Sequence, residues 1–383
     1  MISFTAASKH ASRQRLQRLY HEISFASHGE PRDVLEHRVG GYSKQSNDDE
    51  KIADNFVEIK MLHVPWNPAD VNTVQGKYPV DAVAASLSKS LHFDGCTVAG
   101  SEGWGRVVSQ SKLFPKDSLV SIGSPGSGTL RSTLLLPEDS LLKVPDEIKA
   151  RLGPAGCSLF QLGGTAYRML CDFVALEPGE VVLQNCGNSG VGYMASQIAA
   201  SLFGCPLVSL IRRGQKSNEE FEALVQFLKQ DAKNAHVVSE EELQNPDSLK
   251  AFQGRLRELS GNGRLPRLAF NAVGGPSASV LLKSLDTGGY MVTYGGMAMQ
   301  PVSVAIPQLI FKDVHVVGYW HSRWMRQHSQ GDRQNMIDIL CKAVLEQELK
   351  TPEARIFPLS EVKEALDWQA KQGAVRKKLV FKV

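Results

Sequence analysis

The first half of the chain contains short segments in which apolar and polar side chains alternate. Residues 56–64 have the two-residue period of a strand with one buried face. Shorter apolar runs follow near residues 105–109, 118–122 and 132–136, separated by glycines and prolines. Regularly spaced strands with turn signals between them favour a β-rich, barrel-like unit, which we place at residues 28–163.

Beyond this unit, buried strands alternate with helices as far as residue 318. The predicted strands are 181–185, 206–211, 235–239, 268–273 and 289–294, and the predicted helices include 155–176, 190–203 and 219–230. Repeated strand–helix units predict an α/β fold with a doubly wound parallel sheet at residues 164–318. The remainder, residues 319–383, ends in an apolar run at 378–383 that we expect to return to the β-rich unit.

Residues 1–27 have the features of a mitochondrial transit peptide, because basic residues outnumber the single acid, Glu22, with serines and apolar residues between them. The basic residues are Lys9, Arg13, Arg15 and Arg18, and Leu16, Leu19, Tyr20 and Ile23 would form one apolar face of a helix. We therefore expect a location in the mitochondrial matrix, with a disordered basic tail as the alternative. No apolar run approaches the roughly 20 residues of a membrane span.

The composition is that of an ordinary globular protein, since the 383 residues are 42% hydrophobic and 22% charged. A formal net charge of +3 is too small to indicate nucleic acid binding. The six cysteines are scattered without a C-x-x-C pair. This spacing favours reduced, buried thiols over a disulfide framework or a structural zinc site.

A glycine-rich turn follows the predicted strand that ends at Asn185. Residues 186–192 read Cys-Gly-Asn-Ser-Gly-Val-Gly and lead directly into a predicted helix. Glycines let the backbone approach a pyrophosphate, and the helix start offers N–H groups and a positive dipole end. We expect Ser189, Gly190, Val191 and Gly192 to hold a dinucleotide phosphate, with a simple turn as the alternative.

The next predicted strand is followed by Arg212 and Arg213, roughly 20 residues beyond the turn. An acid at this place would accept the ribose hydroxyls of NAD, whereas guanidinium groups pair with the 2′-phosphate of NADP. The sequence therefore predicts NADPH as the cofactor. Two surface arginines without a ligand are the alternative.

The segment from Pro65 to Pro79, which we expect to form a loop, resembles the signature of the mitochondrial 2-enoyl thioester reductases. Further segments similar to that family are 100–105, 165–170, 188–192, 271–275, 294–297, 311–313 and 318–320. The resemblance extends from about Asp54 to the C-terminus. It implies a zinc-free medium-chain dehydrogenase/reductase, in which a Rossmann sheet is inserted into a GroES-like catalytic domain. It also implies a homodimer that reduces trans-2-enoyl groups, carried on acyl carrier protein or coenzyme A, in mitochondrial fatty acid synthesis.

The resemblance assigns the catalytic role to Tyr78. A phenol is protonated at neutral pH and can stabilise or protonate the enolate that forms when hydride adds to the β-carbon of an enoyl thioester. An ordinary turn aromatic before Pro79 is the alternative. Asn72 and Trp320 resemble positions near the substrate, although an Asn in a turn and a Trp in a core are the commoner explanations. The residues implied to contact the cofactor are Tyr294, Gly295, Gly296, Met297, Tyr319, Trp320, His321 and Lys377.

Zinc-dependent relatives carry a histidine directly before the glutamate of the first glycine motif, where this chain has Ser101 before Glu102. Closely spaced thiolate ligands are missing as well, so we expect no metal.

The chain also departs from the family pattern at three places. Leu162-Gly163 stands where the family has Asn-Pro, Gly214 stands where an arginine is usual, and residues 81–94 form an insert that could reshape the acyl entrance. Two other functions stay open. One is an NADPH-dependent reductase of quinones or α,β-unsaturated ketones on the same scaffold. The other is a non-catalytic NADPH-binding homologue, which the loss of Asn at Leu162 would favour.

Overall fold

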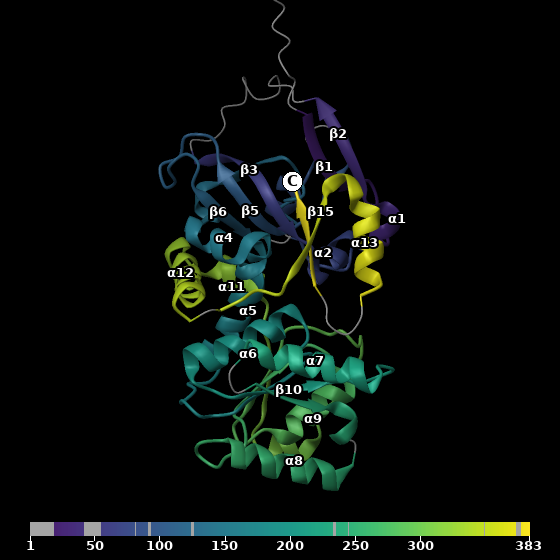
Figure 1. The fold of residues 1–383 in the computed structure, drawn as a ribbon, viewed down its shortest axis with the longest axis vertical. Coiled ribbons are helices and arrows are strands. Elements are labelled where there is room, and N and C mark those ends of the chain that lie inside the picture. Colours follow the sequence, from purple (N-terminus) through teal and green to yellow (C-terminus); the bar gives the residue numbers. More distant parts are fainter. Residues whose placement is uncertain are drawn as a thin grey trace, which may run out of the picture.

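The computed structural model consists of two units stacked along its long axis (Figure 1). One unit is rich in β-strands and contains both described ends of the chain, and the other is an α/β sandwich. The described residues are 19–41, 55–80, 82–90, 93–123, 126–232, 235–243, 245–347, 349–372 and 377–383. The predicted fold class, a parallel sheet unit inserted into a β-rich unit, is confirmed.

The main sheet of the β-rich unit has the strand order β15-β16-β3-β5-β6-β8, and β7 pairs with the long strand β3. The strands are β3 (Phe56–Pro65), β5 (Glu102–Val107), β6 (Leu119–Gly123), β7 (Thr133–Pro137), β8 (Leu142–Lys143), β15 (Ala354–Pro358) and β16 (Lys378–Lys382). β16 pairs antiparallel with β3, with Phe381 opposite Val64. The C-terminal run therefore returns to the first unit, as the sequence predicts.

The helix expected at the N-terminus is wrong for residues 19–25. Strand β1 (Leu19–Phe25) pairs with β2 (Glu36–Gly41) and with β4 (Thr97–Val98). Its Ile23 is fully buried, and the Ile23 amide donates to the carbonyl of Leu130. Tyr20 and Ile23 therefore lie in the core and do not form the apolar face of a helix. Residues 1–18 of the predicted transit peptide lie outside the described residues.

The α/β unit contains a parallel sheet in the order β11-β10-β9-β12-β13-β14. Its elements are β9 (Val182–Asn185), α6 (Gly190–Phe203), β10 (Leu207–Ile211), α7 (Asn218–Gln230), β11 (Ala235–Ser239), η4 (Glu240–Leu243), α8 (Pro246–Leu259), β12 (Leu268–Asn271), α9 (Gly275–Ser284), β13 (Tyr290–Thr293), α10 (Ile306–Ile310) and β14 (His315–Gly318). This is the Rossmann strand order, in which ligands bind at the carboxyl ends of the central strands. The edge strand β14 was not predicted.

The remaining helices cover the β-rich unit or join it to the parallel sheet. They are α1 (Pro31–Val34), α2 (Pro68–Val74), α3 (Ala82–Leu87), η2 (Glu138–Ser140), α4 (Asp146–Leu152), η3 (Gly153–Ser158), α5 (Leu159–Cys171), α11 (His321–Gln327), α12 (Gln330–Glu346), η5 (Leu359–Glu361) and α13 (Val362–Ala370). Helix α5 crosses the predicted boundary at residue 163. Its side chains share one apolar core with α6 and α12, including Leu162, Met194 and Leu340. The two units are therefore continuous at this helix.

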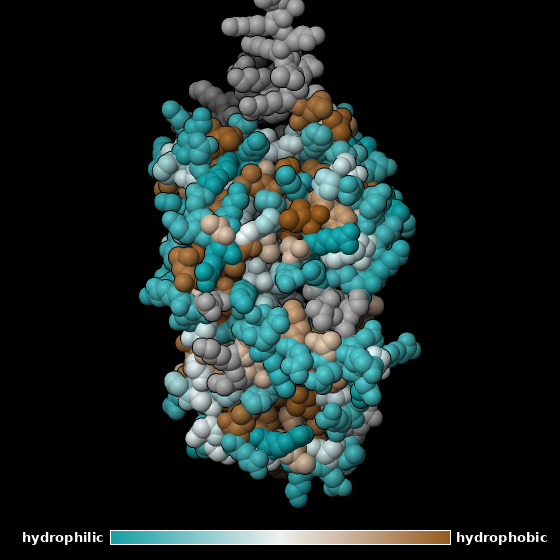
Figure 2. Space-filling model, viewed as in Figure 1, coloured by the Kyte–Doolittle hydropathy of each residue, from teal (hydrophilic) through white to brown (hydrophobic). Residues whose placement is uncertain are grey.

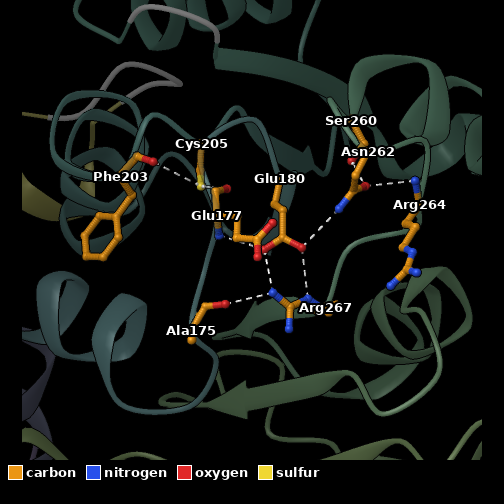
Figure 3. Close-up of polar contacts among 9 residues, drawn as sticks. All are labelled: Ala175, Glu177, Glu180, Phe203, Cys205, Ser260, Asn262, Arg264 and Arg267. Carbon is orange, nitrogen blue, oxygen red and sulfur yellow. Dashed lines mark hydrogen bonds and ion pairs between the residues drawn. The ribbon is translucent and has the colours of Figure 1, made fainter.

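A cluster of polar side chains links the N-terminal ends of two central strands, at the edge of the sheet opposite the glycine turn (Figure 3). Glu180 precedes β9, and Arg267 precedes β12. The Arg267 guanidinium donates to both carboxylate oxygens of Glu180, at 2.9 and 2.7 Å, and also to the carbonyl of Ala175. Asn262 donates to the same carboxylate at 3.2 Å. The cluster joins the starts of two neighbouring strands and leaves their carboxyl ends open.

The face seen in Figure 1 is mostly hydrophilic, and its apolar side chains gather in small patches (Figure 2). In the part of the chain that the structure describes, no helix has the length and apolar character needed to cross a membrane.

Candidate active site

The segment expected to be a loop begins with a short helix, α2, so that expectation is wrong for residues 68–74. Pro68 occupies the first turn, where its missing N–H costs nothing. The carboxylate of Asp70 accepts a hydrogen bond from the backbone N–H of Asn67 at 2.7 Å and so caps the helix. The helix gives the following turn, with Tyr78, a fixed starting point.

Tyr78 is held in place from two directions. The carbonyl of Asn72 accepts hydrogen bonds from the amides of Lys77 and Tyr78, at 2.8 and 3.1 Å. The indole N–H of Trp320 donates to the Tyr78 hydroxyl at 2.7 Å, with the two rings nearly perpendicular. The structure therefore brings Tyr78 and Trp320 together. The Asn72 side chain is exposed, and its backbone shapes the turn.

Beneath this turn lies a buried polar network that the sequence did not reveal. The Asn67 side chain donates to Glu102 at 3.1 Å and accepts from the Lys378 ammonium at 2.5 Å. The Ser101 hydroxyl donates to Asp70 at 2.6 Å. Burial raises the pKa of Asp70 to about 6, and burial also raises the pKa of Glu102. One ammonium thus faces two buried carboxyl groups, which it compensates only in part.

This network includes Ser101, which stands where the resemblance to zinc-dependent relatives implies a metal-binding histidine. Glu102 accepts hydrogen bonds from the Asn67 side chain at 3.1 Å and from the backbone amide of Gln161 at 2.7 Å. The Lys378 ammonium donates to the side-chain oxygen of Asn67. Within the described ranges, no group of three or more His, Cys, Asp or Glu residues could hold a metal ion.

The glycine turn lies at the carboxyl end of β9, as predicted. The Ser189 hydroxyl caps α6 by accepting a hydrogen bond from the amide of Gly192 at 3.1 Å. A Cβ atom added to Gly192 would lie 2.7 Å from the carbonyl oxygen of Cys186, so only glycine fits there. The 14-residue helix α6 presents its N-terminus at this point. Both features suit the pyrophosphate of a dinucleotide.

Leu162, at the position where the resemblance implies an Asn, packs directly against this turn. A Cβ atom added to Gly190 would lie 2.8 Å from a methyl group of Leu162. Leu162 is buried, and its side chain belongs to the apolar core that α5 shares with α6. An apolar contact therefore supports the glycine turn.

The two arginines after β10 differ in their surroundings. The Arg213 guanidinium donates to the Asn218 side chain and lies 5.3 Å over the Phe221 ring. Arg212 is exposed at the open edge of the sheet. Sequence reasoning did not identify Lys216. Its ammonium lies 3.2 Å from the backbone carbonyl oxygens of both arginines. We therefore expect Arg212 and Lys216 to provide most of the positive charge for a 2′-phosphate.

The segment after β13 borders the glycine turn. The Tyr294 hydroxyl lies next to Ser189 and Cys186, and burial raises the pKa of Tyr294. Gly295 packs closely against Ala272, because an added Cβ would lie 3.1 Å from the Ala272 carbonyl. Gly296 and Met297 are exposed at this edge.

The residues after β14 do not all face the same space. His321 is buried against Phe160, and its ring bonds to the Tyr319 hydroxyl at 2.8 Å. Burial lowers the pKa of His321 to about 3, so the imidazole is neutral. Lys377 is exposed and forms an ion pair with Glu353 at 2.8 Å. Of the predicted cofactor contacts, His321 lies in the core and Lys377 is engaged elsewhere.

A pair of buried asparagines marks the carboxyl ends of the two central strands. The amide group of Asn185, at the end of β9, donates to the Asn271 side chain at 2.8 Å, and its oxygen accepts from the Ala272 amide at 2.7 Å. Sequence reasoning gave this pair no role. A polar residue that ends each of two apolar strands was the available signal.

The chain is similar over most of its length to curated mitochondrial reductases, while no family model matches it. The enoyl-acyl-carrier-protein reductase, mitochondrial, of Xenopus tropicalis is 36% identical over 352 residues, which cover 90% of each chain. The protein of the same name from Homo sapiens is 35% identical over 353 residues, covering 90% of this chain and 84% of the human protein.

Solved structures agree with this relationship. A mutant of Etr1p in complex with NADP and crotonyl-CoA superposes with a TM-score of 0.78 at 25% identity, covering 95% of this chain and 99% of that one. The NADPH:quinone reductase from Bacillus thuringiensis has a TM-score of 0.74 at 20% identity over 95% of this chain and 99% of that one, which shows a common fold alone. Identity above one third across nine-tenths of the sequence shows more than a fold. The chain belongs to the family of the mitochondrial enoyl-acyl-carrier-protein reductases.

Proposed function

We propose that this chain reduces trans-2-enoyl thioesters to saturated acyl thioesters with NADPH, as a step of mitochondrial fatty acid synthesis. The observation that carries the proposal is the position of the Tyr78 hydroxyl. It meets Trp320 just after β14, at the carboxyl edge of the parallel sheet that also carries the glycine turn. A proton donor and a dinucleotide site thus lie at the same carboxyl edge of the parallel sheet.

NADPH, when bound, supplies the hydride that adds to the β-carbon of the enoyl group. Negative charge then moves onto the thioester oxygen, and the α-carbon takes up a proton. Since an indole N–H can only donate, the Tyr78 oxygen is the acceptor in its bond to Trp320, and its own hydrogen stays available. Tyr78 can therefore donate a hydrogen bond to the thioester oxygen or pass a proton to the substrate.

Either acyl carrier protein or coenzyme A could carry the enoyl group in this proposal. A quinone or unsaturated ketone reductase would use the same glycine turn and Arg212, but it would not require the segment from Asn67 to Tyr78. A non-catalytic homologue would gain support only from Leu162. The Leu162 side chain packs against Gly190 and so supports the glycine turn, which argues against loss of the cofactor site.

The test is oxidation of NADPH by the full chain with trans-2-enoyl-CoA, with NADH and a quinone as alternative reactants. We expect rapid oxidation of NADPH with the thioester. Tyr78→Phe should lower kcat by about 100-fold or more while NADPH still binds. Tight NADPH binding without turnover on any enoyl thioester would refute the proposal, and preferred turnover of the quinone would favour the second function.

We also propose a homodimer formed along β14. Within the described residues this strand pairs only with β13, so its outer edge offers unpaired backbone groups. Exposed apolar side chains gather in the preceding segment: Met299, Ile306, Leu309, Ile310 and Phe311. A second copy related by a two-fold axis would cover both features. Light scattering should give twice the monomer mass, and Ile310→Glu should shift the protein toward monomer.

A further inference from the structure

The turn between β10 and α7 carries the two arginines expected to meet the cofactor. The strand ends at Ile211, and α7 begins after Ser217, whose side chain caps the helix by accepting a hydrogen bond from the Glu220 amide at 3.2 Å. Gly214, in the middle of the turn, has a φ of +60°, a left-handed conformation that residues with a side chain rarely adopt. The turn at residues 212–216 is therefore anchored at both ends.

A carboxylate from the end of the neighbouring strand holds the middle of this turn. Glu241, in η4 just after β11, accepts hydrogen bonds from the backbone amides of Arg213 and Gly214, at 3.0 and 2.9 Å. It also accepts a hydrogen bond from the Ser239 hydroxyl at 2.7 Å. Two successive backbone N–H groups that point at one anion form the concave arrangement by which turns bind anions. Glu241 thus occupies an anion site made by the protein's own backbone.

The charges around the turn agree with this geometry. Although burial opposes it, hydrogen bonds from the two backbone amides and from Ser239 lower the pKa of Glu241 to about 2. The carboxylate is therefore ionised at neutral pH, and its hydrogen bonds are of the stronger, charge-assisted kind. The Lys216 ammonium donates to the carbonyls of Arg212 and Arg213, each at 3.2 Å. One acid and one base thus fix both the amides and the carbonyls at the start of the turn.

This arrangement leaves recognition of a 2′-phosphate to side chains. Because Glu241 accepts from both amides, the backbone of the turn does not offer them to a second anion. The Arg213 guanidinium donates to Asn218, so the exposed Arg212 and the half-buried Lys216 remain. Both side chains start from the backbone that Glu241 holds, so its conformation sets the direction in which they point.

We propose that Glu241 is a positioning residue that makes the site select NADPH over NADH, because it holds the turn in the conformation that presents Arg212 to the 2′-phosphate. The inference rests on the proposed function, which uses NADPH. A carboxylate near a phosphate repels it, so a purely electrostatic effect of Glu241 would weaken NADPH binding. Positioning has the opposite sign, since it makes Glu241 strengthen NADPH binding.

The experiment measures the dissociation constants of NADPH and NADH for the full chain by fluorescence titration. NADH lacks the 2′-phosphate and so reports on the rest of the cofactor site. Glu241→Ala removes the carboxylate, and Glu241→Gln keeps one acceptor oxygen for the Arg213 amide. Glu242→Ala is the matched control, because Glu242 is the next residue of η4, is exposed and has the same charge.

We expect Glu241→Ala to weaken NADPH binding by about tenfold, since Arg212 then loses the fixed position from which it makes a charge-assisted hydrogen bond. NADH binding and the melting temperature should stay as in the unsubstituted chain, and Glu241→Gln should show a smaller loss. Glu242→Ala should leave NADPH binding unchanged or make it slightly tighter.

Two results would overturn the inference. One is unchanged or tighter NADPH binding by Glu241→Ala, and the other is an equal loss of affinity for NADPH and NADH, which would indicate general damage to the site. In both cases the unsubstituted chain would still prefer NADPH, and the proposed function would stand. An unsubstituted chain that binds NADH as tightly as NADPH would instead contradict the proposed function and this inference together.

Discussion

The indole N–H of Trp320 donates a hydrogen bond of 2.7 Å to the hydroxyl of Tyr78, although 242 positions separate the two residues. Tyr78 follows helix α2 of the β-rich unit, and Trp320 follows the last strand of the parallel sheet. The bond therefore spans the two units at the candidate active site. It also decides which way the phenol proton points.

Replacing Trp320 by Phe should disturb this orientation while keeping an aromatic ring in place. We expect kcat to fall by about fivefold, because one neutral hydrogen bond contributes about 1 kcal/mol. Steady-state kinetics with enoyl-CoA would measure the effect, and the melting temperature serves as the control for folding. If kcat of the Trp320→Phe variant stayed at the original value, the bond would have no part in turnover.

The exposed position of Arg212 predicts that Arg212 contributes more to NADPH affinity than Arg213 does. Arg212→Glu should weaken NADPH binding by about 10 to 100-fold, because a charge-assisted hydrogen bond contributes about 1.5 to 3 kcal/mol. Arg213→Glu should have a smaller effect, since its guanidinium already donates to Asn218. Fluorescence titration with NADPH and NADH would measure both. An equal loss in the two variants would contradict this assignment.

The ammonium of Lys378 offsets the negative charge of two buried carboxyl groups, so replacing Lys378 should lower the stability of the fold. Lys378→Met should lower the free energy of unfolding by about 3 kcal/mol, as expected when a buried charge loses its partner. The exposed Lys382, at the end of the same strand, supplies the matched control Lys382→Met. Thermal unfolding at neutral pH would compare the two variants, and equal melting temperatures would show that the network is not stabilised by Lys378.

The same network gives the pH dependence a definite sign. Burial raises the pKa of Asp70 from 3.8 to about 6. An acid with a raised pKa binds its proton more tightly in the folded state, so its stabilising contribution is complete below about pH 4 and is lost as pH rises toward 6. Asp70→Asn should flatten this part of the stability profile. A profile that kept the same slope would assign the titration to another group.

The Glu180–Arg267 pair should stabilise the sheet without affecting the site. Although burial opposes it, the hydrogen bonds from Arg267 lower the pKa of Glu180, so this contribution is present above the ordinary carboxyl pKa and fades as pH falls. Arg267→Met should cost about 1 to 2 kcal/mol at neutral pH, since the arginine is partly exposed. Arg264→Met, on a neighbouring exposed side chain, is the control. Urea unfolding at neutral and acidic pH would show whether the loss is confined to neutral pH.

Local sequence patterns predicted the parallel sheet well because its helices and strands have a clear hydrophobic periodicity and clear sequence signals at their ends. Helix α6 begins at Gly190 and ends at Phe203, as predicted, since the glycine turn and Gly204 bound it. Strand β14 was missed because its four residues lie at the sheet edge, where Val316 and Gly318 are exposed. A short edge strand carries too little apolar signal.

Contacts between distant residues explain the errors and omissions. The spacing of Leu19, Tyr20 and Ile23 fitted a helix, but the buried Arg131 lies beside Tyr20 and Glu22 and accommodates them in a strand. Tyr78 was identified through the family resemblance. The link between Asn67 and Lys378 joins positions 311 residues apart, and no local pattern contains that information.

That separation has a consequence for the order of assembly. Asn67 leaves the ribosome long before Lys378, so the catalytic turn cannot acquire its ammonium partner until β16 has docked beside β3. Contacts between such distant positions form late in folding because a long loop must close first. A partly synthesised chain would therefore contain Tyr78 without a finished support beneath it. Competence to react with an enoyl thioester should appear as one of the last events of folding.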